Sequence, residues 1–560
     1  MGCCHLGPSF PTWLKSQKYV DHLDFSNASI SGSIPYWFWE FSYSLSHLNL
    51  SFNQLAGQLP SPLKFGSHAP ISMYLSGVVV DFSSNNFSGS VPIPSGSFYL
   101  LDLSKNKFSG NIPNKWNITG GTFVFLSIAN NQINGEIPAW IGNIVPVLEV
   151  FDLSNNNLIG SIPSSIGNCS GLAALDLSNN HLSGTIPTFL GQLSGLKSLH
   201  LNDNKFHGQL PSSFENLSSL ETLSLGNNRL NGSIPPWIGK GFESLRILSL
   251  RSNSFSGELP ALLSNLSSIQ ILDLAENQLT GSIPASFGHF NAMLQAQIIN
   301  RYLWYGAAPI YQNAAYGKNT DGYIGTMEFG NYYESFVVNM KGQLLRYTKT
   351  LSLVTMLDLS GNNLSGDLPI EMTNLLGLVV LNLSRNRFTG HIPKSISKLK
   401  QLSSLDLSSN RFSGAIPQSL GSLSFLGYLN LSNNELSGPI PDNDHMLTFN
   451  ASSFAGNVGL CGGPLAVKCP GDDENEKPDK GWMTPVDTGN GDSFIDKWFY
   501  LSIGLGFAAG ILLPYLIMAM RKSWSAAYFD VVDKAVDRIL YLWLKYRNMK
   551  QRTKGHQRRR

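Results

Sequence analysis

The sequence predicts an α/β-type repeat solenoid, in which coils of about two dozen residues stack and contribute their strands to one parallel sheet. The phrase L-x-L-S-x-N-x-L-S-G-x-I-P recurs along the 560 residues, and most steps between its copies are 24 or 25 residues. One such coil cannot bury its own apolar face, so stacking must supply the core. The Asn of the phrase falls at Asn53, Asn85, Asn106, Asn131, Asn156, Asn180, Asn204, Asn228, Asn253, Asn277, Asn362, Asn386, Asn410 and Asn434, and a degenerate copy with Ala28 in that slot opens the chain, which makes 15 copies.

Each residue type in the phrase has a physical role. The two leucines of L-x-L, such as Leu175 and Leu177, alternate with period two and therefore face the same side of a short strand. We expect the Asn amide to lie buried after the strand and to bond backbone groups of neighbouring coils. The Gly permits a turn that a Cβ would penalise, and the Pro ends the hydrogen-bonded ladder.

The S-G-x-I-P half of the phrase resembles the plant-specific class of leucine-rich repeat. That resemblance implies a twisted superhelix with parallel strands on its concave face. We assign these repeats to residues 1–290 and 347–448.

An aromatic island interrupts the repeats at residues 291–346, where the step from Asn277 to Asn362 is 85 residues. A loop this long is usually functional or disordered, and its many aromatic residues argue against disorder. An island followed by four repeats resembles the plant receptor-like proteins, and Lys341-Gly342 followed by Tyr347 resembles their island-exit signature. Two interpretations remain open: the island helps to form a ligand site, or its aromatic residues only pack it onto the solenoid.

The last repeat runs into residues 449–470, which we expect to cap the solenoid. Cys461 and Cys469 lie close together there, and in an oxidising compartment they would form a disulfide; two free thiols are the alternative. This segment resembles the carboxy-terminal cap of plant receptor repeats.

A single membrane span is predicted at residues 498–520, which contain no charged residue. The preceding linker, residues 471–497, is acidic, whereas the tail, residues 521–560, has 12 Lys/Arg and three Asp/Glu. The positive-inside rule therefore predicts a single-pass type I protein of the plasma membrane, with its repeats outside and its carboxy terminus in the cytosol. Gly506 and Gly510 form a G-x-x-x-G that could pair two helices, although this motif is common by chance.

The Asn-x-Ser/Thr acceptor sites agree with that orientation, because none lies beyond residue 450. They are Asn27, Asn49, Asn86, Asn117, Asn168, Asn216, Asn231, Asn265, Asn363, Asn382, Asn430 and Asn450.

Three further expectations concern what the chain lacks. We find no catalytic, metal-binding or cofactor motif, and the tail is too short for a protein kinase and lacks kinase motifs, so we expect no enzymatic activity. A mildly acidic body with a basic end does not suggest nucleic-acid binding. The first residues lack a signal peptide and resemble the middle of a repeat, so we expect an amino-terminally truncated sequence; a shortened natural variant is the alternative.

The residue between the two strand leucines is often Asp, which makes an acidic column on the concave face. This column could steer a basic ligand, or Asp could simply be the solvated default of the repeat. The default breaks in neighbouring coils, and we predict a possible ligand surface there. It comprises His200, Asp203, Ser224, Arg229, Ser249 and Arg251.

The sequence as a whole resembles receptor-like proteins of the ethylene-inducing xylanase receptor and Cf-like type. That resemblance implies an extracellular protein or peptide ligand, with a defence elicitor as the favoured class. It also implies an adaptor leucine-rich-repeat receptor kinase paired through the span, and a co-receptor kinase at the last four repeats. A developmental peptide receptor of the same architecture and a non-signalling inhibitory repeat protein are the alternatives.

Overall fold

The computed structural model describes residues 2, 4–17, 20–65, 77–118, 123–298, 303–306 and 331–470. These residues belong to one compact unit, Met1–Asp473. No helix among them is both long enough and apolar enough to span a bilayer. The predicted linker, span and tail lie outside the described residues, and Gly506 and Gly510 lie there too.

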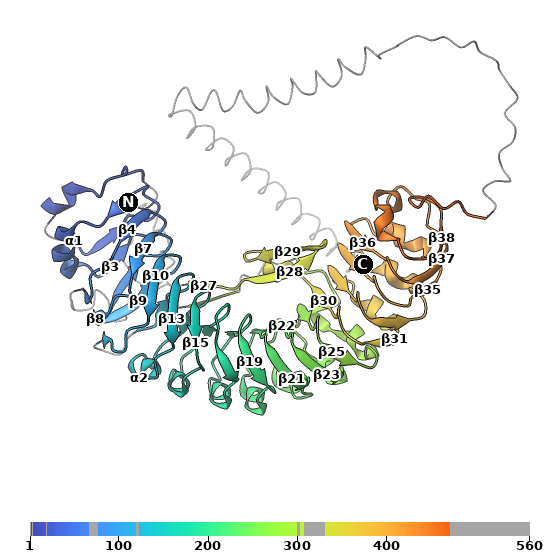
Figure 1. Cartoon of the computed structure of the whole chain (residues 1–560), viewed down its shortest axis with the longest axis horizontal. Helices are drawn as coiled ribbons and strands as arrows, with labels where there is room; N and C mark the ends of the chain where they lie inside the picture. The colour runs from blue at the N-terminus through green and yellow to red at the C-terminus, as the bar shows by residue number, and fades with distance from the viewer. Residues whose placement is uncertain are drawn as a thin grey trace, which may run out of the picture. The chain divides into compact units, whose positions relative to one another are not determined.

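One parallel sheet lines the concave side of this curved unit (Figure 1), and each copy of the repeated phrase contributes one strand to it. Its 15 strands are paired in chain order, so the solenoid with parallel concave strands that the sequence predicts is confirmed. The strands are β1 (His22–Asp24), β3 (His47–Asn49), β6 (Val78–Asp81), β9 (Phe98–Asp102), β12 (Phe125–Ser127), β14 (Val150–Asp152), β16 (Ala174–Asp176), β18 (Ser198–His200), β20 (Thr222–Ser224), β22 (Ile247–Ser249), β24 (Ile271–Asp273), β30 (Met356–Asp358), β32 (Val380–Asn382), β34 (Ser404–Asp406) and β36 (Tyr428–Asn430).

The island leaves this sheet unbroken. Strand β24 pairs directly with β30, with Leu272 opposite Leu357, although the island separates the two strands in sequence. The coils on either side of the island therefore stack as neighbours.

Further short ladders follow the concave strands within the coils. They comprise β2 (Ser31–Ser33), β4 (Gln54–Gly57), β7 (Asn86–Gly89), β10 (Lys107–Asn111), β13 (Gln132–Glu136) and β15 (Asn157–Ile159); β17 (Ser183–Thr185), β19 (Lys205–Gly208), β21 (Arg229–Ser233), β23 (Ser254–Glu258) and β25 (Gln278–Thr280); β5 (Leu63–Lys64), β8 (Pro94–Gly96) and β11 (Asn117–Ile118); β31 (Ser365–Asp367) and β33 (Arg387–Thr389); and β35 (Ser413–Gly414), β37 (Glu435–Pro439) and β38 (Gly459–Cys461).

Short helical turns complete most coils. The α-helices are α1 (Tyr36–Phe41), α2 (Ile141–Ile144) and α3 (Ile238–Gly241). The 3-10 helices are η1 (Thr12–Ser16), η2 (Ser42–Ser44), η3 (Ser164–Asn168), η4 (Thr188–Gln192), η5 (Ser212–Asn216), η6 (Ala261–Asn265), η7 (Ala285–His289), η8 (Asn291–Met293), η9 (Leu351–Leu353), η10 (Ile370–Asn374), η11 (Lys394–Lys398), η12 (Gln418–Ser422), η13 (Met446–Thr448) and η14 (Ala451–Ser453).

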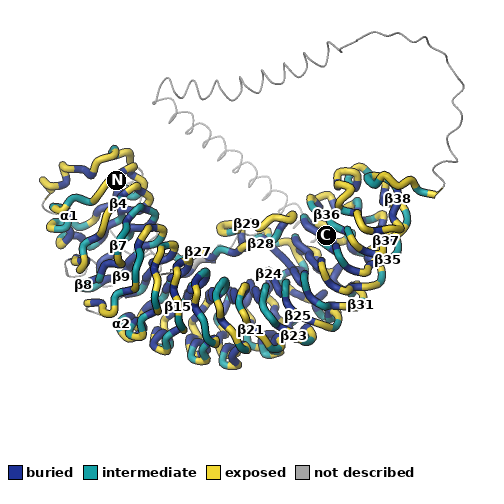
Figure 2. Tube along the Cα trace, in the orientation of Figure 1, coloured by how far each residue is buried: buried dark blue, intermediate teal, exposed yellow. Residues whose placement is uncertain are grey.

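The core follows the repeated phrase. Both leucines of a typical strand, such as Leu248 and Leu250, are fully buried, and the buried leucines form one continuous cluster along the solenoid. Figure 2 shows this burial along the coils.

The repeated Asn forms a second continuous feature. The Asn277 Nδ2 donates to the carbonyl oxygens of Leu250, Leu274 and Ala275 at 3.0, 3.2 and 3.0 Å, and its Oδ1 accepts from the Phe255 N–H at 3.0 Å. Each such Asn thus satisfies backbone groups of its own coil and of the preceding one, as the sequence predicts.

Candidate functional site

The end of the island forms a β-hairpin. Strands β28 (Phe336–Met340) and β29 (Gln343–Tyr347) are antiparallel, with Phe336 opposite Tyr347 and Met340 opposite Gln343. The two turn residues, Lys341 and Gly342, have φ angles of 55° and 71°. Positive φ at both positions gives the tight turn that suits the twist of a hairpin, and Gly adopts it without a steric penalty.

The hairpin lies over the concave strands (Figure 1). Its buried side chains Phe336, Val338 and Met340 pack in one cluster with residues of the first outward column, which we define as the residue just before the first strand leucine. The column residues in this cluster are Ile247, Ile271, Met356 and Val380. A run of apolar side chains in this column is the sequence signal that could have revealed the covered part of the concave face.

The tip of the hairpin reaches the last two concave strands. The Lys341 N–H donates to the Ser404 Oγ in β34 at 3.3 Å. A Cβ on Gly342 would lie 3.1 Å from the Tyr428 ring in β36, so the turn sits directly against that ring. The hairpin therefore extends along the concave face to the end of the repeats.

A polar contact anchors the island ahead of the hairpin. The Glu334 side chain is fully buried; its Oε1 lies 2.7 Å from the His200 Nε2, and its Oε2 accepts from the Ser198 Oγ at 2.8 Å. Burial lowers the pKa of His200, but the charge of Glu334 and its hydrogen bond outweigh burial and raise that pKa to about 9. Burial conversely raises the pKa of Glu334, and the charge of His200 outweighs it, so the pKa of Glu334 falls below its usual value.

Two tyrosines extend this anchor towards earlier coils. They come from strand β26 (Trp304–Gly306) and its antiparallel partner β27 (Asn331–Tyr333). The Tyr332 hydroxyl donates to the Asp176 Oδ2 at 2.8 Å, and the Tyr305 ring stacks with it at a centroid distance of 6.4 Å. Tyr305 is buried in a cluster with column residues that include Val150 and Ala174.

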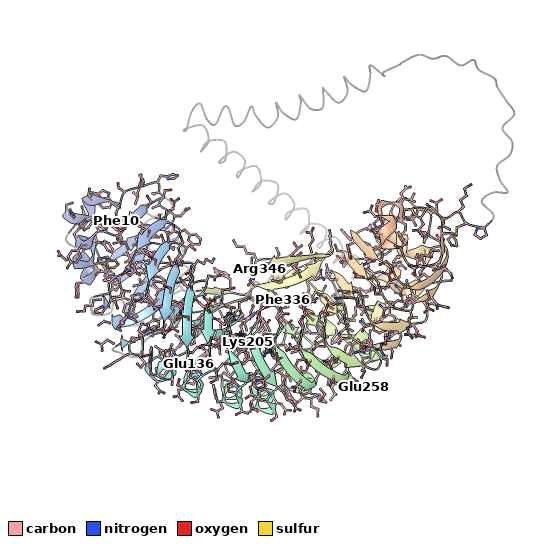
Figure 3. All side chains as sticks on the ribbon, viewed as in Figure 1. Phe10, Glu136, Lys205, Glu258, Phe336 and Arg346 are labelled. Atoms are coloured by element: carbon pink, nitrogen blue, oxygen red, sulfur yellow. A yellow bond between two sulfur atoms is a disulfide. The ribbon has the colours of Figure 1, made fainter. Side chains whose placement is uncertain are left out.

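The described island residues and the concave strands enclose a groove of about 820 Å³. Its floor is the second outward column, the residue between the two strand leucines, from Asp102 to Asp273. The hairpin provides one wall with Val337, Asn339, Leu344 and Arg346. A smaller groove of about 340 Å³ continues over β32, β34 and β36 and shares Asn339. Figure 3 shows the hairpin residues Phe336 and Arg346 above the concave strands.

Most of the predicted ligand surface lines this groove, namely His200, Asp203, Ser224, Ser249 and Arg251. Arg229 is not among the lining residues, because it begins β21 in a side ladder. Three of these strand residues are buried: the exposed fractions of His200, Ser224 and Ser249 are only 4% to 5%. The physical reason at His200 is the contact with Glu334.

Arg251 also has structural partners. Its Nη1 lies 3.3 Å from the Asp273 Oδ1 and 3.0 Å from the Asp358 Oδ2. It therefore joins three consecutive coils, across the point where the island leaves the solenoid.

The acidic column is not simply solvated, which corrects that interpretation. The Asp176 Oδ1 accepts from the Ser178 N–H and Oγ at 3.0 and 2.6 Å, so the carboxylate caps the turn after the strand. Asp273 and Asp358 are 3% and 0% exposed. Burial, together with a neighbouring Asp in each case, raises the pKa of Asp102, Asp152 and Asp273 to about 7.

The other predicted site residues lie elsewhere. Cys461 and Cys469 are joined by a disulfide next to the last coil. Among the acceptor asparagines, Asn382 is buried on β32, and its Nδ2 donates to the Asp358 Oδ2 at 3.2 Å. Asn49, Asn86, Asn363 and Asn430 are half-buried, whereas Asn27, Asn117, Asn168, Asn216, Asn231, Asn265 and Asn450 are exposed.

The described ranges contain no group of three or more His, Cys, Asp or Glu residues that could hold a metal ion. The groove has a polar floor, and its hairpin wall combines the apolar Val337 and Leu344 with Asn339 and Arg346.

Comparisons with known proteins agree with this architecture. Leucine-rich-repeat family models match residues 194–255, 352–412 and 376–436, and further single-repeat matches cover 44–65, 122–144, 147–169, 171–193 and 268–290. The chain is 42% identical over 92 residues to receptor-like protein EIX1 and 37% identical over 100 residues to receptor-like protein EIX2, both of Solanum lycopersicum. The homologues of this chain are plant receptor-like proteins with leucine-rich repeats. These two matches cover 16% and 17% of the chain and only 8% and 9% of the relatives.

Solved structures with this fold include plant receptor ectodomains. The leucine-rich-repeat ectodomain of the Arabidopsis receptor kinase HAESA, in complex with an extended IDA peptide hormone, has a TM-score of 0.57 and 28% identity, covering 83% of this chain and 69% of that one. The peptide hormone receptor RGFR1 in complex with RGF2 has a TM-score of 0.55 and 28% identity, covering 79% and 67%. These likenesses support the leucine-rich-repeat solenoid fold of this chain.

Proposed function

We propose that this chain is a plasma-membrane receptor-like protein, which binds an extracellular protein or peptide ligand and signals through partner receptor kinases. The observation that carries the proposal is the groove between the hairpin and the concave strands. It is long and polar, and it is lined by coils that depart from the repeated template. Relatives of the same fold are described in complex with peptide hormones.

A defence elicitor is the favoured ligand class, because the sequence resembles receptors of the ethylene-inducing xylanase type. The similarity of the chain to receptor-like proteins EIX1 and EIX2 supports that resemblance. A developmental peptide is the second candidate, and the hormone complexes of HAESA and RGFR1 favour it. In both cases the span, residues 498–520, pairs with an adaptor receptor kinase through Gly506 and Gly510, and a co-receptor kinase docks on residues 347–448.

Co-purification tests this proposal. The tagged full chain is expressed in plant leaf cells, and associated receptor kinases are identified before and after treatment with a fungal elicitor preparation. We expect one kinase to be recovered in both states and a second only after treatment. Recovery of no kinase in either state would refute the signalling role.

Matched variants separate the two parts of the mechanism. Val337→Trp fills the groove from the wall of the hairpin and should abolish only the elicitor-dependent association; Val147→Trp, at a similarly exposed site away from the groove, should not. Gly506→Leu should abolish the constitutive association, whereas Gly504→Leu, outside the G-x-x-x-G spacing, should retain it. An endogenous peptide that replaces the elicitor would favour the developmental role.

A further inference from the structure

The outer edge of β29 carries unused backbone hydrogen-bonding groups. Met340 and Gln343 flank a two-residue turn, so they form a hydrogen-bonded pair, and the alternate residues of β29 point their N–H and C=O away from β28. These residues are Leu344 and Arg346. Among the described residues, neither has a backbone partner on that side.

This edge is open to solvent, and its backbone is regular. Leu344 is 71% exposed, and the neighbouring Leu345 is 38% exposed. The strand contains no Pro, and its pairing with β28 is regular, without a bulge. Strand β28 carries the buried side chains, while β29 lies farther from the concave sheet (Figure 2). An exposed, regular edge of this kind is a template for an added strand.

The segment around this edge is basic. Residues 335–350 contain Lys341, Arg346 and Lys349 and no Asp or Glu. Arg346 donates from its Nη1 to the Ser335 Oγ at 3.0 Å, and within the described part of the chain it forms no ion pair. Arg346 and Leu344 both line the groove. A segment that pairs with β29 would therefore meet one cationic and one apolar side chain on its groove face.

We propose that β29 accepts an extended acidic segment of the polypeptide ligand as the third strand of the hairpin sheet. The inference rests on the proposed ligand-binding function and adds the chemistry of recognition. Main-chain bonds to Leu344 and Arg346 provide affinity, as in other cases of strand addition. An acidic side chain beside Arg346 and an apolar one beside Leu344 provide specificity.

The binding test uses the purified full chain in detergent and a capped peptide that repeats Glu-Thr-Val-Thr as the probe, so that Glu and Val alternate along one face of the strand and can lie beside Arg346 and Leu344. The comparison peptides are the same sequence with N-methyl groups on alternate residues, which cannot pair along one edge, and a Lys-for-Glu version. Peptide affinity is measured by fluorescence anisotropy, and the exchange of the Leu344 and Arg346 amides by hydrogen–deuterium exchange. The Glu–Val peptide should bind most tightly and should slow exchange at both amides.

Variants of the edge sharpen the test. Leu344→Pro removes an outward N–H without removing a bond to β28 and should weaken peptide binding about tenfold, whereas Leu344→Ala retains the N–H and should cost less than about threefold. Arg346→Glu should reverse the preference towards the Lys peptide, and Arg346→Gln should reduce the preference without reversing it. Exchange at Val338 and Leu345, which bond across the hairpin, reports whether Leu344→Pro leaves the hairpin intact.

Equal binding of the Glu–Val peptide and its N-methylated form would overturn the proposal, as would unchanged exchange at Leu344 and Arg346. If Leu344→Pro melts the hairpin, the comparison of those two peptides on the unmodified chain decides the question. If the peptide does not bind along β29 but elicitor-dependent kinase association is intact, strand addition is refuted and the proposed function is not. Absence of any kinase association refutes the proposed function independently.

Discussion

The solenoid and the hairpin that crosses it are held together in different ways. A solenoid strand such as β24 pairs on both sides, its leucines are fully buried, and an Asn bonds each coil to the one before. Among the described residues, strands β28 and β29 pair only with each other. The hairpin is held to the concave strands by one buried face, by the bond from Lys341 to Ser404 at its tip and by Glu334 behind it. The solenoid is thus a rigid scaffold, whereas the hairpin has the few buried contacts typical of an element that opens or adapts on binding.

The largest expected effect comes from the core of the scaffold. Leu272→Ala should lower the free energy of unfolding by about 3 kcal/mol, because it leaves a cavity in the continuous core. Val338→Ala, in the hairpin, should cost the scaffold almost nothing and should instead speed amide exchange in β28 and β29. Denaturant unfolding and hydrogen–deuterium exchange measure the two outcomes. Equal loss of scaffold stability in both variants would remove the distinction between the two regions.

The next largest effect should come from the Asn ladder, the row of repeated Asn side chains that each bond two neighbouring coils. The Asn362 Nδ2 donates to the carbonyl oxygens of Leu274, Leu359 and Ser360, and its Oδ1 accepts from Leu279 N–H, across the junction where the island is inserted. Asn362→Ala should lower the free energy of unfolding by about 2 to 3 kcal/mol, because it leaves several buried backbone groups unpaired. The exposed Asn374→Ala serves as the control in the same denaturant titration. No difference between the two variants would show that the coils on either side do not depend on this ladder.

The anchor of the island should depend on pH. Because the pKa of His200 is raised, its contribution to the docking of the island is complete below pH 6.5 and is lost as the pH rises through about 9. The lowered pKa of Glu334 means that its contribution is present above pH 4.5 and is lost as the pH falls below that. Docking should therefore be tightest between pH 4.5 and 6.5.

Glu334→Gln should weaken docking by about 2 kcal/mol at pH 6 and should abolish the loss at alkaline pH. Amide exchange at Glu334 and Ser335 reports docking, and the exposed Glu215→Gln is the control. An alkaline loss that persists in Glu334→Gln would assign the pH dependence to another group.

The smallest effect should come from the acidic column. Burial raises the pKa of Asp152 to about 7, so the folded state binds the extra proton and its stability falls as the pH rises from 3.8 to about 7. Asp152→Asn should remove this fall and stabilise the scaffold by about 1 kcal/mol at pH 8. Asn suits the slot, because Asn382 accepts from the Ser384 N–H and Oγ in the same way as the aspartates. Thermal unfolding at pH 4 and pH 8 measures this change, with the exposed Asp442→Asn as the control. The same pH dependence of stability in both variants would contradict the assignment to Asp152.

Sequence reasoning succeeded where one rule is repeated. The spacing of the leucines and of Asn277 and its equivalents predicts the strands, the core and the Asn ladder, because each coil solves the same local problem. It did not reveal the contact of His200 with Glu334, which lies 134 residues away in the chain. It also missed the structural role of the column aspartates, because the hydrogen bonds that Asp176 accepts from Ser178 depend on the shape of the turn.

The sequence alone therefore determined the coil, its period and the island that interrupts it, since these depend on residue types within one repeat and its neighbour. Only the tertiary structure decided where the island lies: a hairpin packed on Ile271 and Met356, a groove beside it, and an open edge at Leu344 and Arg346. Those features arise from contacts between segments far apart in the chain, which side-chain shape and burial select. The apolar run at Ile247, Ile271, Met356 and Val380 marks only the covered face, not the segment that covers it.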